Sequence, residues 1–146
     1  MNGDVAEGGD GLITGALIEK NIIYNCGASG GAAINMDGVE QSVVANNLVY
    51  DCQAGGITSF AFSGLEGGDG NAFYHNTVHF DAAEGRFGLQ LIDGSQNATV
   101  KNNVLVCGDY ALEIDTDSLT GLVSDNNAFY RHGATSPILN HATAIP

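Results

Sequence analysis

A short phrase recurs along the chain, and its spacing restricts the fold more than any other feature of the sequence. Each copy has an apolar residue, then polar residues that include Asn, then more apolar residues. The phrase reads "VVANNLVYDC" at 43–52, and its other copies are "LIEKNIIYNC" at 17–26, "AFYHNTVHF" at 72–80, "TVKNNVLVC" at 99–107 and "LVSDNNAFY" at 122–130. Self-similarity of this kind is typical of repeat architectures.

The repeat length identifies the kind of structural unit. The apolar residue three positions before each Asn is Ile18, Val44, Phe73, Val100 or Val123, at spacings of 26, 29, 27 and 23 residues. Helical repeats need apolar residues at helical spacing over ten or more positions, and no window of this chain has them. The repeats are therefore expected to be built from strands.

A second phrase, a small residue followed by strict alternation, lies between copies of the first. It reads "GAAINMDG" at 31–38, "GGITSF" at 55–60, "FGLQLID" at 87–93 and "YALEID" at 110–115. Alternation with a period of two predicts half-buried strands. The inward residues are then Ile34, Met36, Ile57, Ser59, Leu89, Leu91, Leu112 and Ile114. The outward residues are Asn35, Asp37, Thr58, Phe60, Gln90, Ile92, Glu113 and Asp115. Stacking each strand on its counterpart in the next repeat gives a parallel sheet that winds as a coil.

These two alternating phrases resemble the right-handed parallel β-helix of the pectin-lyase-like superfamily, over roughly residues 11–132. The resemblance implies an all-β solenoid of about five coils. The length of the chain indicates one domain over residues 1–146, with irregular ends expected near 1–10 and 133–146. In that superfamily polysaccharide lyases, hydrolases and epimerases act on the outer face of one parallel sheet. An extracellular location is a further implication of the resemblance.

Charge and hydropathy exclude several classes of partner. There are 17 acidic residues against 4 Lys and Arg, so the formal net charge is −13. Nucleic acid and anionic membranes are therefore disfavoured, and a strongly anionic polymer would need cations to screen the surface. No apolar run is long enough for a transmembrane helix, and the N-terminus lacks the pattern of a signal peptide.

The repeated Asn residues are expected to have a structural role. Asn47, Asn76 and Asn103 can stack on one another and satisfy the backbone of sharp corners, which we favour over a row that binds sugar or metal. His75 is interpreted as another member of the stack. Cys26, Cys52 and Cys107 follow their phrases at nearly the same offset, and buried thiols are favoured over a disulfide or a metal site. Oxidation of Cys26 and Cys52 stays open, because neighbouring coils bring them together.

The outward carboxylates are the candidates for catalysis. Glu113 and Asp115 lie two residues apart on one predicted strand, which places their carboxylates about 7 Å apart on one face. Asp93 follows the end of the neighbouring strand. Three such groups could perform general acid–base chemistry, and the separation is of the order found in inverting glycosidases. With Asp117, the same three residues are also candidates for a calcium site.

Candidate substrate-binding residues share this outward face. They are Asn35, Asp37, Thr58, Phe60, Gln90 and Arg86. Phe60 could stack on a sugar ring, and Arg86 belongs to one of two long insertions, 61–70 and 81–87, where binding residues are often found. The resemblance implies an Arg or Lys base in lyases and a Gly-His-Gly-like phrase in hydrolases. No Arg or Lys lies on the outward strand positions, and the phrase is absent.

Two hypotheses of function follow. The first is a non-catalytic β-helix module that binds polysaccharide and self-associates through its coil ends, because an uncapped coil end is an exposed sheet edge. The second is a polysaccharide-active enzyme, a glycoside hydrolase or lyase, that uses the outward carboxylates. The first is ranked slightly ahead, because the catalytic patterns of the superfamily are missing. No cofactor is required in either case, although calcium remains a candidate.

Overall fold

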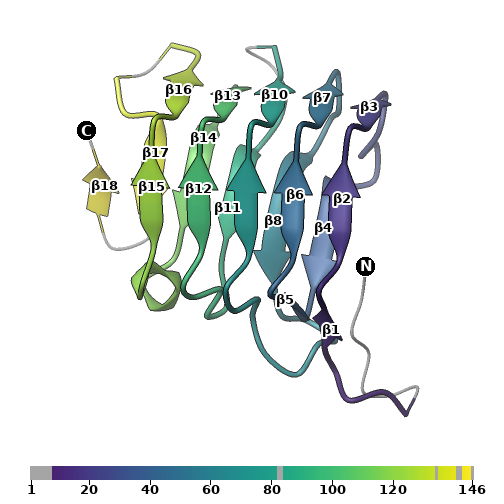
Figure 1. The fold of residues 1–146 in the computed structure, drawn as a ribbon. Helices are drawn as coiled ribbons and strands as arrows, with labels where there is room; N and C mark the ends of the chain where they lie inside the picture. Colours follow the sequence, from purple (N-terminus) through teal and green to yellow (C-terminus); the bar gives the residue numbers. More distant parts are fainter. Residues whose placement is uncertain (1–7, 82–83, 134, 141–142, 146) are drawn as a thin grey trace.

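The computed structural model describes residues 8–81, 84–133, 135–140 and 143–145, and the chain winds through them as a parallel β-helix of about four turns (Figure 1). Three sheets run along the helix. Sheet I contains β2 (Leu17–Glu19), β6 (Val43–Ala45), β9 (Ala72–Tyr74), β12 (Thr99–Lys101) and β15 (Val123–Asp125). Sheet II contains β3 (Ile22–Tyr24), β7 (Leu48–Tyr50), β10 (Thr77–His79), β13 (Val104–Cys107) and β16 (Ala128–Arg131).

Sheet III carries the candidate site. It contains β4 (Ala32–Asp37), β8 (Gly55–Phe60), β11 (Phe87–Leu91), β14 (Tyr110–Ile114) and β17 (Ile138–Asn140), with β18 (Thr143–Ile145) antiparallel at its edge. Two short strands, β1 (Ile13–Thr14) and β5 (Val39–Glu40), pair with each other, and the single turn of 3-10 helix η1 spans Asp117–Leu119. The predicted all-β parallel β-helix is confirmed.

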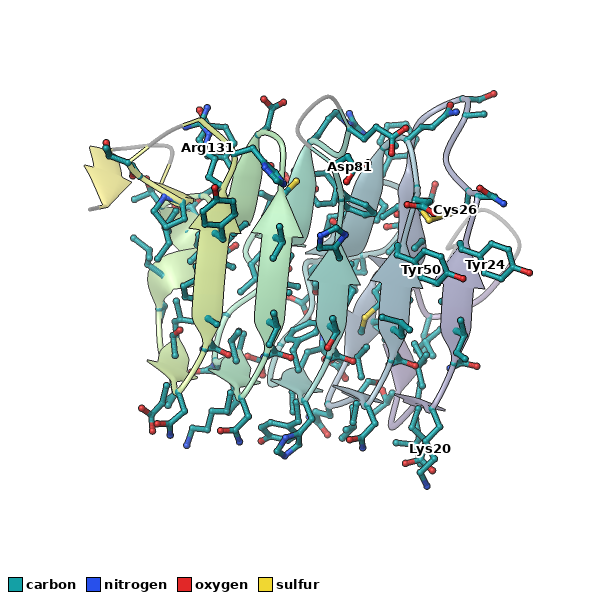
Figure 2. All side chains as sticks on the ribbon, turned by 90° about the horizontal axis from the view of Figure 1, so that it is seen from above. Lys20, Tyr24, Cys26, Tyr50, Asp81 and Arg131 are labelled. Carbon is teal, nitrogen blue, oxygen red and sulfur yellow. A yellow bond between two sulfur atoms is a disulfide. The ribbon has the colours of Figure 1, made fainter. Side chains whose placement is uncertain are left out.

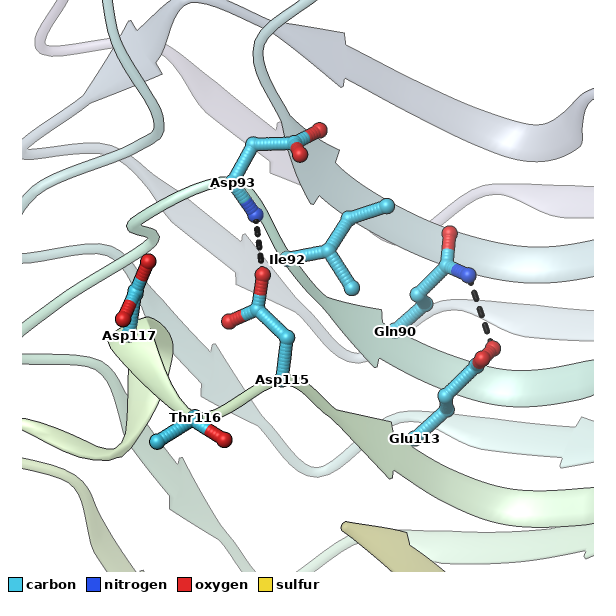
Figure 3. A pocket seen from close by; sticks show the side chains of 7 residues that line it. All are labelled: Gln90, Ile92, Asp93, Glu113, Asp115, Thr116 and Asp117. Atoms are coloured by element: carbon cyan, nitrogen blue, oxygen red, sulfur yellow. Dashed lines mark hydrogen bonds between the residues drawn. The ribbon is translucent and has the colours of Figure 1, made fainter. Parts of the chain in front are cut away.

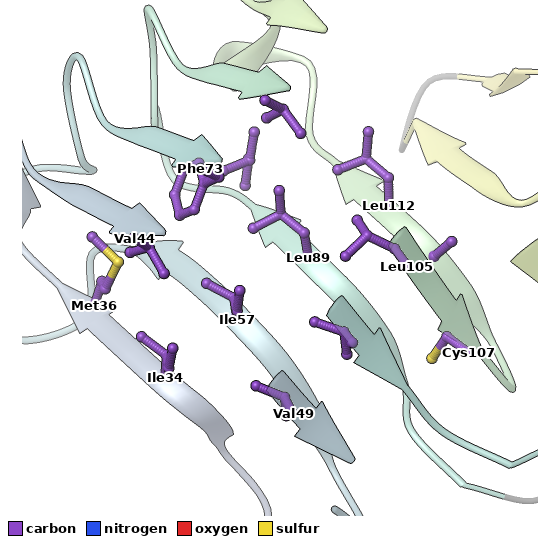
Figure 4. Packing of buried hydrophobic residues seen from close by; sticks show 14 of the residues in the cluster. Ile34, Met36, Val44, Val49, Ile57, Phe73, Leu89, Leu105, Cys107 and Leu112 are labelled. Atoms are coloured by element: carbon purple, nitrogen blue, oxygen red, sulfur yellow. The ribbon is translucent and has the colours of Figure 1, made fainter. Parts of the chain in front are cut away.

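The alternating phrases have the predicted register. Ile34 pairs with Ile57, Ile57 with Leu89 and Leu89 with Leu112, and all four side chains are buried. Together with residues of the other sheets, such as Phe73, they fill the centre of the coil (Figure 4). Stacked inward rows of this kind give a continuous apolar core along the helix.

One expected repeat position is wrong by a single residue. Val123 does not occupy the inward position that Val100 has in the preceding coil; it pairs with Thr99 and is 45% exposed. Ser124 is the residue opposite Val100. Because side chains alternate along a strand, a shift of one residue moves the valine to the outer face.

Each strand of sheet I is bracketed by two bends in which the backbone is left-handed. The residues with positive φ, five positions apart in every coil, are Gly15 and Lys20, Gln41 and Asn46, Gly70 and His75, Asn97 and Asn102, and Gly121 and Asn126. Gly and Asn adopt this conformation at the lowest cost. His75 therefore takes the bend position in the third coil, as Asn46 does in the second.

An asparagine ladder follows the second bend, and it confirms the structural role of these residues. Its members are Asn21, Asn47, Asn76, Asn103 and Asn127. Asn47 donates to Oδ1 of Asn76 from its Nδ2 at 3.0 Å and from its backbone N–H at 3.1 Å. The Nδ2 of Asn76 also donates to the backbone oxygen of Val44, at 2.9 Å. Buried backbone groups at the corner are thereby satisfied.

The three cysteines differ in their bonding state: two form a disulfide and one is a free thiol. Cys26 and Cys52 form a disulfide between the first two coils, with their Cα atoms 4.6 Å apart (Figure 2). The preference for thiols was wrong for this pair, because stacked coils place the two side chains at bonding distance. Cys107 is the buried thiol that was predicted. Burial raises its pKa to about 11, and its Sγ donates to the backbone oxygen of Gly85 at 2.9 Å.

The two ends of the chain are described only in part. The irregular ends predicted at 1–10 and 133–146 include residues 1–7, 134, 141–142 and 146, which lie outside the described residues. The described part of the second end contains β17 and β18. None of the described segments forms a helix with the length and apolar character needed to cross a membrane.

Candidate binding face on sheet III

A row of polar side chains crosses the outer face of sheet III at one level. Asn35, Thr58, Gln90 and Glu113 are paired in register on β4, β8, β11 and β14. The hydroxyl of Thr58 donates to Oε1 of Gln90 at 2.9 Å, and Nε2 of Gln90 donates to Oε2 of Glu113 at 2.7 Å. The pleat directs these four residues outward, so the sequence alone predicts the row. The hydrogen bonds hold it in one conformation.

Two hollows adjoin at this row. The first, of about 400 Å³, is lined by Gln90, Ile92, Asp93, Glu113, Asp115, Thr116 and Asp117 (Figure 3). The second, of about 190 Å³, is lined by Gly31, Asn35, Thr58, Phe60, Arg86, Phe87, Gln90 and Ile92. Gln90 and Ile92 line both hollows, which makes the face continuous from the acidic side to the aromatic side. We call these the acidic hollow and the aromatic hollow.

The predicted catalytic carboxylates all line the acidic hollow, but they are not equivalent. Asp115 accepts the backbone N–H of Asp93 at 2.7 Å on one oxygen and that of Ser118 at 2.9 Å on the other. Glu113 accepts the amide of Gln90. The carboxylate of Asp93 points away from that of Asp115 (Figure 3). Asp115 is therefore held as a fixed acceptor at the turn that begins η1.

The four residues proposed for calcium, Asp93, Glu113, Asp115 and Asp117, also line the acidic hollow. Across the described residues, however, no three carboxylate, thiol or imidazole groups come together in an arrangement that could hold a metal ion. The different orientations of Asp93 and Asp115 agree with this, because calcium needs several oxygens directed at one point.

Phe60 and Arg86 belong to the aromatic hollow. The guanidinium of Arg86 donates to the backbone oxygen of Gly31 at 3.3 Å and lies 5.6 Å from the centre of the Phe87 ring. The insertion that carries Arg86 therefore returns to the strand face. Residues 82–83 of that insertion lie outside the described residues.

Asp37, a predicted substrate-binding residue, lies in neither of these hollows and is only 5% exposed. Its carboxylate accepts the backbone N–H groups of Phe62, Ser63 and Gly64 at 2.8 to 3.2 Å. Burial by itself raises the pKa of Asp37, but these three N–H groups outweigh it, so the pKa is below the ordinary value of 3.8. In this structure Asp37 anchors the start of the insertion at 61–70.

The rest of that insertion lines a separate hollow of about 440 Å³. Glu66 and Asp69 line it together with Glu40, Asp93 and Gln96. Asp93 therefore lines both this hollow and the acidic hollow. The sequence indicated the insertion as a place for binding residues, but it did not show which side of the coil the insertion would cover.

Comparison with known proteins identifies the family. No curated protein and no solved structure matches the chain significantly. Residues 3–145 match the family described as "Right handed beta helix region". That match covers nearly the whole chain and agrees with the coiled parallel sheets and the Asn ladder, and with membership of the pectin-lyase-like superfamily. The chain therefore belongs to the right-handed β-helix family.

Proposed function

We propose that this chain is a non-catalytic module that binds a neutral polysaccharide on the outer face of sheet III. The hydrogen-bonded row from Thr58 through Gln90 to Glu113 carries the proposal. Sugar hydroxyls both donate and accept, so they match a row that mixes hydroxyl, amide and carboxylate groups. Phe60 and Ile92 add apolar surface for the faces of the sugar rings.

Charge favours a neutral chain over an acidic one. The acidic hollow is lined by four carboxylates in a protein whose net charge is −13, so a uronate polymer would be repelled. Calcium in solution could bridge the carboxylates of such a polymer and those of the hollow. The proposal therefore expects neutral polysaccharides to bind with or without calcium, and uronate polymers to bind only when calcium is present.

A glycan array probed with and without calcium is the first test, followed by titration calorimetry on the glycans that bind. Gln90→Ala removes the centre of the polar row, and we expect it to weaken binding by roughly tenfold or more. Gln53→Ala is the matched control, because Gln53 is exposed on the turn between β7 and β8 and lines neither hollow. The proposal would be overturned if no neutral or uronate glycan bound, or if the two variants bound with equal affinity.

The enzyme alternative rests on Glu113 and Asp115, which line one hollow. It predicts that a bound glycan is cut, with new reducing ends if the reaction is hydrolysis and unsaturated uronates if it is elimination. Glu113→Gln would then abolish cleavage while binding remained. The binding proposal instead expects intact glycan after prolonged incubation with the wild-type chain.

A further inference from the structure

None of the ten outward positions on the strands of sheet II is Asp, Glu, Lys or Arg. Two rows of residues point outward from its five strands. One row is Ile22, Leu48, Thr77, Val104 and Ala128, and the other is Tyr24, Tyr50, His79, Val106 and Tyr130. The residues between the rows, such as Val49 and Val78, are buried in the core. We call these ten outward positions the uncharged face.

The other two sheets show how unusual this is for the molecule. Sheet I presents Glu19, Lys101 and Asp125 on its outward rows. The outward positions of sheet III include Glu113 and Asp115. With 17 acidic residues in the chain, a sheet face chosen without constraint would be expected to hold some of them. The uncharged face has none.

The same face concentrates the exposed apolar side chains. Among the described residues, nine large hydrophobic side chains are exposed, and five of them lie here: Ile22, Tyr24, Leu48, Val104 and Tyr130, at 38 to 66% exposure. Contiguous apolar surface of this kind marks an interaction site on a soluble protein. Figure 2 looks onto this side of the molecule, where Tyr24 and Tyr50 lie side by side.

The geometry of the tyrosines argues against a sugar as the occupant. The rings of Tyr24 and Tyr50 are stacked, with centres 5.3 Å apart and planes 15° from parallel. Each ring therefore covers one flat face of the other, which reduces the aromatic face left open for a sugar ring. A sugar ring needs an open aromatic face, whereas a flat apolar protein surface can pack against ring edges.

We propose that two copies of this chain dimerise by packing their uncharged faces against each other. Two chains of charge −13 repel each other, and of the three sheet faces only this one lets them meet without opposing carboxylates. Two sheets that pack face to face lie about 10 Å apart. A two-fold axis between the copies, over the middle strand β10 and parallel to it, places the Ile22 end of one copy on the Ala128 end of the other.

The edges of the face suit an interface rim. Exposed Asp51 and Asp81 follow β7 and β10 on one side, and polar corner residues such as Asn46 and His75 precede these strands on the other. An apolar centre with a polar rim is the usual composition of a protein interface. This association differs from the coil-end association expected from the sequence, because it leaves both ends of the helix uncovered.

Sedimentation velocity across a range of concentrations tests the proposal, with Val104→Glu as the disrupting variant. Val104 is 44% exposed on the uncharged face, and Val123, which is 45% exposed on sheet I, provides a control of the same residue type. We expect the wild type and Val123→Glu to be dimers. In Val104→Glu the dimer should dissociate at least about 100-fold more readily, because the two-fold axis introduces two unpaired carboxylates. Leu48→Glu should behave like Val104→Glu.

Circular dichroism and denaturant unfolding show whether each variant is folded, and Leu48→Glu replaces Val104→Glu if the latter is not. Raising the salt concentration should strengthen the dimer, because salt screens the repulsion between the two acidic chains. A wild-type chain that stays monomeric up to millimolar concentration would refute the proposal. So would a dimer that survives both glutamate substitutions, which is the result that coil-end association predicts.

Discussion

Two adjacent residues have different structural roles at each corner of the Asn ladder. The first, such as Asn46 or His75, adopts the left-handed backbone, and the second, such as Asn47 or Asn76, makes the hydrogen bonds to the next coil. This explains why the residue at the first position is Lys, His or Asn, while the residue at the second position is Asn at all five ladder corners. A side chain at the bend only has to tolerate its φ angle, whereas the ladder needs a donor and an acceptor together.

The central member of the ladder should matter most for stability. In Asn76→Ala the backbone N–H and Nδ2 of Asn47 lose their acceptor in a buried site, so we expect the free energy of unfolding to fall by about 2–4 kcal/mol. Asn21→Ala, at the exposed start of the ladder, should cost less than about 1 kcal/mol. Urea denaturation measures both. Equal losses would show that the ladder bonds contribute little.

At the level of elements, the insertion at 61–70 depends on one buried carboxylate. Asp37→Asn should lower the free energy of unfolding by about 1–3 kcal/mol at neutral pH, because three N–H groups lose a charged acceptor. The folded pKa of Asp37 is below 3.8, so the unfolded chain binds its proton first as the pH falls. The contribution is therefore complete above pH 3.8 and declines below it.

Denaturant melts of wild type and Asp37→Asn at neutral and acid pH check this dependence. The difference between the two proteins should narrow as the pH falls below 3.8. Asp81→Asn is the control, since Asp81 is exposed, and it should change stability by less than about 0.5 kcal/mol at either pH. A difference between wild type and Asp37→Asn that does not change with pH would contradict the assignment.

The alternation of inward and outward residues was the main signal from which the strands and their register could be predicted. The register of Asn35, Thr58, Gln90 and Glu113 follows from the period of two along each strand. The role of Asp37 could not be found in this way. It depends on the path of a loop 25 residues later, at Phe62, which has no periodic signal.

The sequence also contains a signal for a second bend in each repeat. Gly15, Gly70 and Gly121, with Gln41 and Asn97 between them, recur five positions before each ladder bend. After this bend Ser42 donates its backbone N–H to Oδ1 of Asn71 at 3.0 Å, which forms a second, shorter ladder. The sequence brought Cys26 and Cys52 together on neighbouring coils but did not decide whether they are bonded, and it did not give the orientation of Asp93, because both depend on distances between side chains.

For the molecule as a whole, the disulfide fastens the first coil to the second. Cys26 and Cys52 are 26 residues apart, and closing a loop of that size stabilises a protein by about 3 kcal/mol in the chain-entropy account. Cys26→Ala combined with Cys52→Ala should lose about this amount. Denaturant melts with and without reductant give the comparison: reductant should destabilise the wild type and leave the double variant unchanged. A reductant effect that persists in the double variant would point to Cys107 instead.

The ladder also has a direction, since each Asn donates to the Asn of the following coil, from Asn21 to Asn127. Consecutive coils are thus joined by the same pair of hydrogen bonds at each corner. These bonds form although the ladder residues are 26, 29, 27 or 24 positions apart in the sequence. A gene encoding such a chain can gain or lose one whole coil and still encode matched corners. The hollows of sheet III do not share this freedom, because they need Thr58, Gln90 and Glu113 on three consecutive coils. The number of coils can therefore vary in evolution while the polar row of sheet III stays fixed to the middle of the helix.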